Sequence, residues 1–289
     1  MSSQEPVNVL INGENTGFLP VTDRGLNYGD GIFTTLSFQE SVPIFLNRHL
    51  SRLQSDADWL GIPFPGQSIL TAESRQLGLG HPGGILKITL TQGSGGRGYR
   101  RPAQAHGTRI LSAHPSPDYP GNLMETGVSA RFCNLRLSLN SRLAGIKHLN
   151  RLEQVLARAE WNDEDIREGL LIDQEGFLVE GVMSNLFLIR DGLLRTPLLD
   201  RCGVFGVMRG LVLDAAQDLG FPTEQTRILP EEAMKADEIF LTNSVIGLWP
   251  VSRLDGISIP LGSMTRQLSQ RIAEMAATDK ALQSKGLLE

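Results

Sequence analysis

Apolar and polar positions alternate, or recur at helical spacing, in both halves of this chain. Alternation over residues 84–91 and a similar run at 108–112 predict half-buried strands. Other short runs of β-forming residues, bounded by turn residues, predict further strands in each half. These strands lie at residues 7–12, 42–46, 128–133, 169–173, 185–190 and 238–242.

Helical spacing of apolar residues marks the segments between these strands. Leu50, Leu53 and Leu60 predict a helix that ends at residue 60, with Asn47 as its N-cap. In the second half, apolar stripes predict helices over residues 149–161, 206–219 and 264–282. The sequence gives no functional role for the last of these helices, which lies beyond Ser263.

A proline-rich segment divides the chain. Residues 113–121 contain three prolines and a glycine, which exclude a helix or a central strand there. Strands and helices on both sides predict two domains of the α/β or α+β class. We place a smaller N-terminal α/β domain at residues 1–114, a linker at 115–121 and a larger C-terminal domain at 122–289.

Composition and charge exclude several classes of protein. With 289 residues, 40% of them hydrophobic, the chain can fill the cores of two domains. A net charge of −5 gives no electrostatic reason to bind nucleic acid or an anionic membrane. The sequence lacks a signal peptide and any apolar run of the roughly 20 residues that span a bilayer. Cys133 and Cys202 are far apart and near no metal-ligand cluster, so we expect reduced, buried thiols, no metal site and a cytoplasmic protein.

Lys147 is the first candidate for chemistry. It lies in a mostly apolar segment just before a predicted helix, in a chain whose positive charge comes mainly from arginine. A partly desolvated ammonium group loses its proton more easily, and the neutral amine is a nucleophile. The alternative is a lysine whose stem packs against apolar residues while its ammonium group reaches water.

Two glycine-containing segments are candidate anion sites. Residues 198–209 lead directly into a predicted helix, whose unsatisfied N–H groups can hold a phosphate. Residues 93–99 follow a predicted strand, and Arg97 within them can pair with a carboxylate or phosphate. The alternatives are an ordinary loop for the first segment, and a hairpin tip or an RNA-binding segment for the second. Glu180, a carboxylate between apolar residues, either meets a cation or lies exposed at a turn before Gly181.

Taken in their order along the chain, these segments resemble the class IV aminotransferase family. Its members are pyridoxal-phosphate enzymes of fold type IV, so the resemblance implies a two-domain D-amino acid aminotransferase-like fold. The larger C-terminal domain is then the cofactor-binding domain. The matching motifs are Tyr28–Gly31, His49–Leu53, Lys147–Asn150, Glu180–Gly181 with Ser184–Phe187, and Gly206–Arg209.

The resemblance implies pyridoxal 5'-phosphate as the cofactor, and it implies roles for residues at the matching positions. Lys147 is expected to bind the cofactor aldehyde covalently and then to transfer protons as a base. Glu180 is expected to pair with the pyridine nitrogen and keep it protonated. The phosphate is expected to be held by Arg52, the backbone amides of Val207 and Met208, and the hydroxyl of Ser244.

Within the family, residues 33–35, 93–99 and 143–154 resemble the 4-amino-4-deoxychorismate lyases. This resemblance implies a carbon–oxygen lyase that converts 4-amino-4-deoxychorismate to 4-aminobenzoate and pyruvate in folate biosynthesis. Arg97 is then expected to bind a substrate carboxylate, and Thr35 to assist proton transfer to the leaving group. The alternative is a transaminase of the same family, acting on D-amino or branched-chain amino acids. Because family members are usually homodimers, a homodimer is expected, with a small-molecule substrate and neither nucleic acid nor membrane as a partner.

Overall fold

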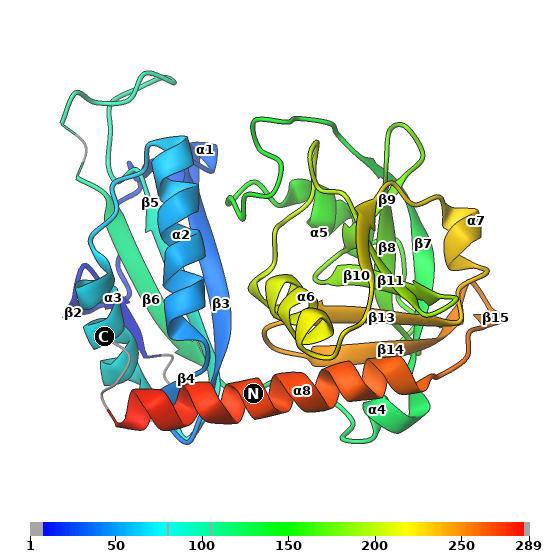
Figure 1. Cartoon of the computed structure of the whole chain (residues 1–289). Coiled ribbons are helices and arrows are strands. Elements are labelled where there is room, and N and C mark those ends of the chain that lie inside the picture. Colours follow the sequence, from blue (N-terminus) through cyan, green and yellow to red (C-terminus); the bar gives the residue numbers. More distant parts are fainter. Residues whose placement is uncertain (1–7, 80, 105, 286–289) are drawn as a thin grey trace. The chain divides into compact units, whose positions relative to one another are not determined.

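The chain forms two compact units, seen in a computed structural model that describes residues 8–79, 81–104 and 106–285 (Figure 1). The N-terminal unit takes its described residues from Met1–Asp118, Lys147–Asn150 and Ala276–Glu289. The C-terminal unit consists of Tyr119–Ile146 and Arg151–Met275. The first division falls inside the predicted linker, but residues 147–150 and the described residues from 276 onward group with the N-terminal unit. This grouping differs from the predicted ranges, which assigned both segments to the larger domain.

The N-terminal unit is built on a six-stranded antiparallel sheet with the strand order β2-β1-β6-β5-β3-β4. Helices α2 (Leu46–Leu60) and α3 (Gln67–Gly78) pack against it, and the short α1 (Arg24–Tyr28) precedes β3 (Figure 1). Leu36, Ile88 and Leu111 from the sheet and Leu50 and Leu53 from α2 are fully buried. The strands are β1 (Val9–Ile11), β2 (Glu14–Asn15), β3 (Gly31–Gln39), β4 (Val42–Pro43), β5 (Gly83–Thr91) and β6 (Thr108–His114).

The predictions for this unit were correct for the strongest patterns and departed from the structure before α2 and at α3. Strand β5 and the end of α2 at Leu60 are confirmed. The predicted N-cap is wrong, because Phe45 occupies that position in a left-handed conformation (φ 56°) and Asn47 lies inside the helix. The predicted strand at 42–46 is therefore only β4. Helix α3 was not predicted, since it buries the polar Glu73, which is held by bidentate hydrogen bonds from Arg109.

The C-terminal unit contains a nine-stranded mixed sheet. Its main path runs β12-β11-β10-β13-β14-β7-β8-β9, and β15 pairs with β14. The contacts of β7 with β8 and β14, and of β11 with β12, are parallel. The strands are β7 (Val128–Leu137), β8 (Ile166–Asp173), β9 (Leu178–Gly181), β10 (Asn185–Arg190), β11 (Leu193–Pro197), β12 (Thr223–Thr226), β13 (Glu238–Asn243), β14 (Gly247–Leu254) and β15 (Ile257–Ser258). The helices are α4 (Leu123–Thr126), α5 (Leu152–Arg158), α6 (Val207–Asp218), α7 (Pro230–Ala233) and α8 (Ser263–Ser284), the last of which continues into the N-terminal unit.

Most elements predicted for this unit are confirmed, including α6 and α8. Helix α5 is shorter than predicted, and its apolar stripe does not lie in the core: Leu152 and Leu156 are 68% and 53% exposed. Cys133 and Cys202 are free thiols, the first buried and the second half-buried. Burial raises the pKa of each thiol to about 12, so neither is a thiolate nucleophile near neutral pH.

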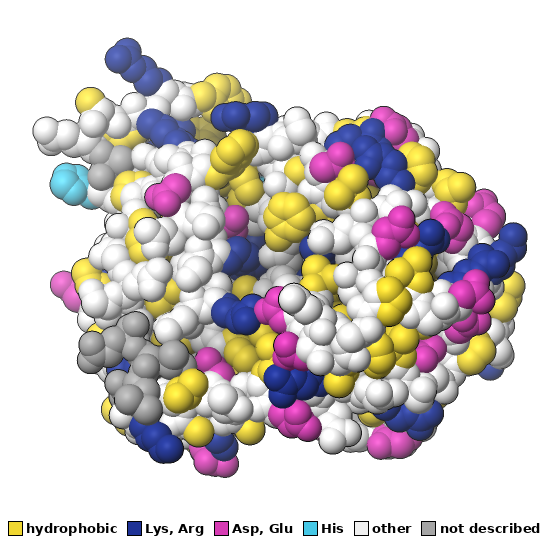
Figure 2. Space-filling view, in the orientation of Figure 1, with side chains coloured by type: hydrophobic (Ala, Val, Ile, Leu, Met, Phe, Trp, Pro, Cys, Tyr) yellow, Lys and Arg dark blue, Asp and Glu magenta, His cyan; other side chains and the backbone are white. Residues whose placement is uncertain are grey.

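Acidic and basic side chains are intermixed over the visible face of the C-terminal unit (Figure 2). Within the described ranges, no helix combines the length and apolarity needed to cross a bilayer. The same residues contain no cluster of histidine, cysteine and carboxylate side chains arranged to hold a metal ion. The cytoplasmic location stays a prediction.

Candidate functional site

The segment that contains Lys147 pairs with the first residues of β3. The amide of Phe33 donates to the carbonyl of Lys147 (3.0 Å), and the amide of Leu149 donates to the carbonyl of Gly31 (2.9 Å). An antiparallel bridge joins Ile32 to His148 between them. This pairing explains why residues 147–150 belong to the N-terminal unit, although they are distant from it in sequence.

The Lys147 side chain lies against the aromatic ring of Phe33. Its Nζ is 4.6 Å from the ring centroid, and its backbone amide donates to Asp56 Oδ2 (3.3 Å). Thr35 follows Phe33 by two residues on β3, so both side chains point to the same face of the sheet. The structure therefore brings Lys147 and Thr35, the two residues predicted to be catalytic, to one part of the N-terminal unit.

Arg52 lies on α2 and bonds to the neighbouring residues of β3. Its Nη2 donates to the hydroxyl of Thr34 (2.8 Å) and to the carbonyl of Phe33 (3.3 Å). Burial lowers the pKa of Arg52, an effect that the nearby Asp56 carboxylate opposes. The buried Nε of Arg52 has no hydrogen-bond partner among the residues described. A buried, partly unsatisfied guanidinium is suited to an anion, as predicted for the phosphate.

His49 supports this arrangement from the interior. Its Nδ1 lies 2.6 Å from the Thr34 hydroxyl, and its pKa is well below the usual value because burial, with help from the charges of Arg52 and Lys147, disfavours the imidazolium. With Nδ1 of the neutral ring as acceptor, the Thr34 hydroxyl accepts from Arg52 and donates to His49. The sequence did not identify Thr34, His49 or Asp56 as parts of the site, although His49 lies within a matching motif.

Glu180 lies on β9 and is only 4% exposed, which excludes the exposed-turn alternative. Its Oε2 accepts a hydrogen bond from the amide of Val204 (2.9 Å) and a long one from Asn185 Nδ2 (3.5 Å). Asn185 Nδ2 also donates to the carbonyl of Val204 (2.9 Å). The carboxylate is thus fixed to the loop that leads into α6.

Helix α6 begins beside the same asparagine. Gly206 is the N-cap, and no side chain of the described residues caps it. A Cβ atom at this position would lie 2.1 Å from Asn185 Oδ1, so only glycine allows this close approach. The amides of Val207 and Met208 lie in the first turn, where N–H groups without helical partners and the helix dipole favour an anion.

A second buried carboxylate, Glu168 on β8, holds the turn between Glu180 and Asn185. One carboxylate oxygen of Glu168 accepts from the amides of Gly169 (3.0 Å) and Val182 (3.1 Å). The other accepts from the amide of Met183 (3.2 Å) and the hydroxyl of Ser184 (2.7 Å). Burial outweighs these four hydrogen bonds and raises the pKa of Glu168 to about 7. This residue was missed because one acidic residue before an apolar run gives no signal of its partners.

The last two predicted residues lie on turns. Ser244 is half-buried in the turn between β13 and β14, where the neighbouring Asn243 donates from Nδ2 to the carbonyl of Met183 (2.9 Å). Arg97 is exposed on the loop that follows β5. In the C-terminal unit, Glu180 and the start of α6 are joined through Asn185, while Lys147, Thr35 and Arg52 gather in the N-terminal unit.

Residues 31–254 match the family model described as Amino-transferase class IV. The chain belongs to this family. The predicted fold class is thereby confirmed, and the family's members include the aminotransferases and lyases to which the chain is similar.

Two relatives named as lyases cover nearly the whole chain. An aminodeoxychorismate lyase of Vibrio harveyi is 32% identical over 265 residues, which are 89% of this chain and 97% of the relative. The crystal structure of 4-amino-4-deoxychorismate lyase from Pseudomonas aeruginosa is 44% identical and superimposes with a TM-score of 0.89, covering 92% of this chain and 98% of that one. A putative branched-chain-amino-acid aminotransferase of Methanocaldococcus jannaschii is 27% identical, over 92% of this chain and 96% of the relative.

Replacement of Gly206 tests the close approach of α6 to Asn185. In Gly206→Ala the new methyl group must displace Asn185, so we expect a loss of about 1–3 kcal/mol in the free energy of unfolding. Gly210, in the same helix, is the matched control because a Cβ atom there meets no atom within 4 Å. Gly210→Ala should stabilise the protein by up to about 1 kcal/mol. Chemical denaturation measures both, and equal effects would contradict the steric argument.

Glu168 should give the stability a defined pH dependence. Its folded pKa of about 7 lies above the usual 4.5, so the folded state holds a proton that the unfolded state has released. Residue 168 does not titrate in Glu168→Gln. Relative to this variant, the free energy of unfolding of the wild type should fall by up to about 1.4 kcal/mol per pH unit as the pH rises between these two values. Denaturant midpoints of both proteins, measured from pH 4.5 to 8, test this. If the wild-type stability minus the Glu168→Gln stability stayed constant or rose with pH, the prediction would be contradicted.

Proposed function

We propose that the chain is an aminodeoxychorismate lyase, which converts 4-amino-4-deoxychorismate to 4-aminobenzoate and pyruvate. The observation that carries the proposal is the agreement in sequence and fold with the Pseudomonas aeruginosa lyase over 92% of the chain, at 44% identity. The relatives named as aminotransferases are less similar, such as the Methanocaldococcus jannaschii protein at 27%. The lyase reaction is therefore favoured over transamination.

We further propose that the protein binds pyridoxal 5'-phosphate, which would supply an electron-accepting ring for the substrate carbon that loses a proton. Three features of the chain fit this cofactor. Lys147 places its amine beside an aromatic ring, Arg52 has a buried Nε without a hydrogen-bond partner in the described residues, and Glu180 is a buried carboxylate whose Oε2 accepts from the Val204 amide. The groups assigned to the phosphate are Arg52, the amides of Val207 and Met208, and Ser244.

The reaction needs a base, a proton donor and a group that orients the substrate. Lys147 would remove the proton from the ring carbon that bears the amine. The bond between the ring carbon and the enolpyruvyl oxygen then breaks, and the ring becomes aromatic. The three-carbon fragment, which keeps this oxygen, takes up a proton to give pyruvate. Thr35, on the same face of β3 as Phe33, would assist that protonation, and Arg97 would bind a carboxylate of the substrate. Atoms balance without a second substrate.

The test is an assay of purified protein with added pyridoxal phosphate and 4-amino-4-deoxychorismate, following 4-aminobenzoate fluorescence. We expect product from the wild type and none from Lys147→Ala, which should also lose the visible absorbance of lysine-bound cofactor. Lys87→Ala is the matched control, because Lys87 Nζ lies 5.1 Å from the same Phe33 ring but its side chain is exposed. This variant should keep both signals.

Two outcomes would change the proposal. Visible absorbance without 4-aminobenzoate would leave the cofactor assignment standing and favour the transaminase, to be assayed with D-amino and branched-chain amino acids. If Lys87→Ala, and not Lys147→Ala, abolished the absorbance, the assignment of the reactive lysine would be wrong.

We propose that the protein is a homodimer and that an apolar patch on the N-terminal unit contributes to the interface. Phe18, Val21, Leu26 and Tyr99 are 88%, 79%, 63% and 88% exposed, and the rings of Tyr99 and Tyr28 are in edge contact at 5.6 Å. Phe18, Val21 and Leu26 lie close together in the sequence, at and before α1. A contiguous patch of exposed apolar side chains is typical of protein–protein contacts.

Light scattering after size exclusion tests the interface. The wild type should have twice the mass of one chain, and Leu26→Asp should shift it toward the monomer because a buried carboxylate would have no partner. Leu79→Asp, at an apolar residue that is 83% exposed and far from the patch in sequence, is the control and should stay dimeric. A dimer that Leu26→Asp leaves intact would place the interface elsewhere.

A further inference from the structure

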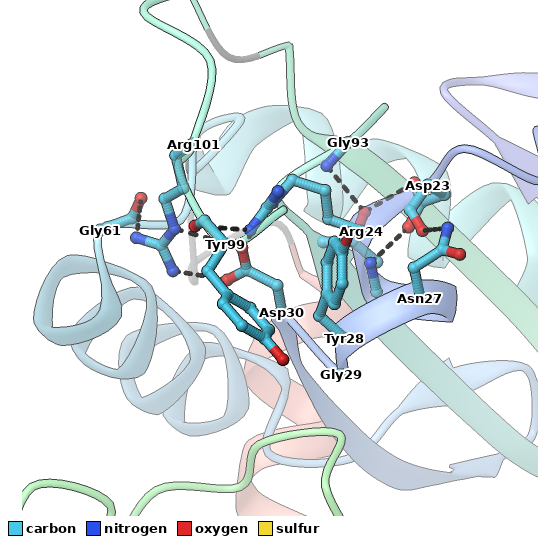
Figure 3. Close-up of polar contacts among 12 residues, drawn as sticks. Asp23, Arg24, Asn27, Tyr28, Gly29, Asp30, Gly61, Gly93, Tyr99 and Arg101 are labelled. Carbon is cyan, nitrogen blue, oxygen red and sulfur yellow. Dashed lines mark hydrogen bonds and ion pairs between the residues drawn. The ribbon is translucent and has the colours of Figure 1, made fainter. Parts of the chain in front are cut away.

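The carboxylate of Asp30 is shared by two arginines from different segments of the N-terminal unit (Figure 3). Arg24 Nε donates to Oδ2 (2.9 Å), Arg101 Nε donates to the same oxygen (3.2 Å), and Arg101 Nη2 donates to Oδ1. Burial would raise the pKa of Asp30, but the hydrogen bonds from the two arginines outweigh it and keep the pKa below its usual value. The cluster is therefore charged at neutral pH.

Arg24 joins this carboxylate to the glycine loop that follows β5. Its Nη1 and Nη2 donate to the carbonyls of Gly98 (3.0 Å) and Tyr99 (3.1 Å), and its backbone amide donates to the carbonyl of Gly93 (2.9 Å). The side chain is almost fully buried, and a Cβ atom on Gly95 would come within 2.9 Å of its Cδ. The loop is thus folded around the Arg24 side chain.

Arg101 fixes the far end of the same loop to α2. Its Nη1 donates to the carbonyls of Leu60 and Gly61, at the C-terminal end of that helix, where a positive charge is favoured (Figure 3). The Tyr28 hydroxyl accepts a hydrogen bond from the amide of Gly98 (3.2 Å) and adds a further contact. The loop is therefore held at Gly93, Gly98 and Tyr99 by Arg24 and at its far end by Arg101, and both arginines are bonded to Asp30.

Arg97 lies in sequence between these anchored positions. It is exposed and makes no hydrogen bond or ion pair with the described part of the chain. A guanidinium on a fixed backbone loses less conformational entropy on binding a carboxylate than one on a mobile loop. The network thus holds the backbone around Arg97 and leaves its charged group to a ligand.

We propose that Asp30, Arg24 and Arg101 are positioning residues that hold loop Gly93–Arg101 in one conformation and so present Arg97 to a carboxylate of the substrate. The link to the substrate depends on the proposed lyase function. The anchoring of the loop does not, so it is measured separately.

Limited digestion with trypsin measures the anchoring without any catalysis. Cleavage after Arg97, followed by mass spectrometry, should be at least about tenfold faster in Arg101→Gln and Asp30→Asn, since each loses hydrogen bonds between charged groups. Arg100→Ala is the matched control: it removes one positive charge from an exposed residue of the same loop, and its cleavage rate after Arg97 should equal that of the wild type. Unchanged cleavage in both test variants would overturn the anchoring.

Kinetics then separate positioning from a general structural role. In Arg101→Gln, KM should rise about tenfold while kcat changes less than about twofold and the visible absorbance of the bound cofactor stays that of the wild type. The same substitution in an Arg97→Ala background should have little further effect, because the group to be positioned is gone. If Arg101→Gln changed KM as much in the Arg97→Ala background as in the wild type, the proposal would be overturned. A loss of cofactor absorbance in parallel with the loss of activity would also overturn it.

Arg101→Gln is the decisive variant because Asp30→Asn leaves the buried Arg24 without its charged partner and lies directly before β3, so it can impair folding. Arg101 is 36% exposed at its side chain and tolerates substitution better. A wild type without lyase activity would refute the proposed function and the role toward the substrate together, while the trypsin result would still decide the anchoring.

Discussion

The pairing of residues 147–150 with the first residues of β3 is the interaction on which the candidate site depends. It fixes the backbone of Lys147 on both sides, through Phe33 and through Leu149, at the edge of the N-terminal sheet. It also requires glycine at position 31, where a Cβ atom would lie 2.6 Å from Leu149 Cδ1 and 2.7 Å from the Leu90 carbonyl. The backbone of Lys147 is thus placed by a sheet contact between distant segments, which gives it a more constant position than a free loop would.

Buried carboxylates play a corresponding part in the C-terminal unit. Glu168 and Glu180 lie on the paired strands β8 and β9. Glu168 accepts hydrogen bonds from the amides of Val182 and Met183, and Glu180 accepts one from the amide of Val204. Removing a carboxylate from water is costly, and such a group is tolerated only when several donors surround it. The two differ in what they hold: Glu168 fixes the turn at residues 182–184, whereas Glu180 is joined to the loop before α6. Because the turn held by Glu168 connects Glu180 to Asn185, Glu168 also helps to fix the positions of these two residues.

The sequence predicted those parts of the fold that local pattern determines. Alternation in β5 and the apolar stripe of α6 were sufficient, since each element buries one face. Helix α3 was missed because its buried positions include Glu73, whose partner Arg109 is distant in sequence. The apolar stripe on α5 predicted a buried face, but Leu152 and Leu156 are exposed in the single chain. Likewise, the motifs located Lys147, Arg52 and Glu180, but long-range hydrogen bonds decide their surroundings, so Thr34, Asp56 and Glu168 could not be inferred.

The shared fold does not by itself distinguish a lyase from an aminotransferase. The branched-chain aminotransferase of Escherichia coli superimposes with a TM-score of 0.84 at 23% identity, so the two proteins share the fold, and a fold does not decide a reaction. Reaction choice must then come from side chains that meet the substrate and not from the sheets that hold the residues proposed for the cofactor. The loop Gly93–Arg101 fits that role, because its backbone is bonded to buried, charged groups while Arg97 extends into solvent. An exposed guanidinium on an anchored loop can select for a carboxylate by position as well as by charge, whereas one on a flexible glycine-rich loop selects by charge alone.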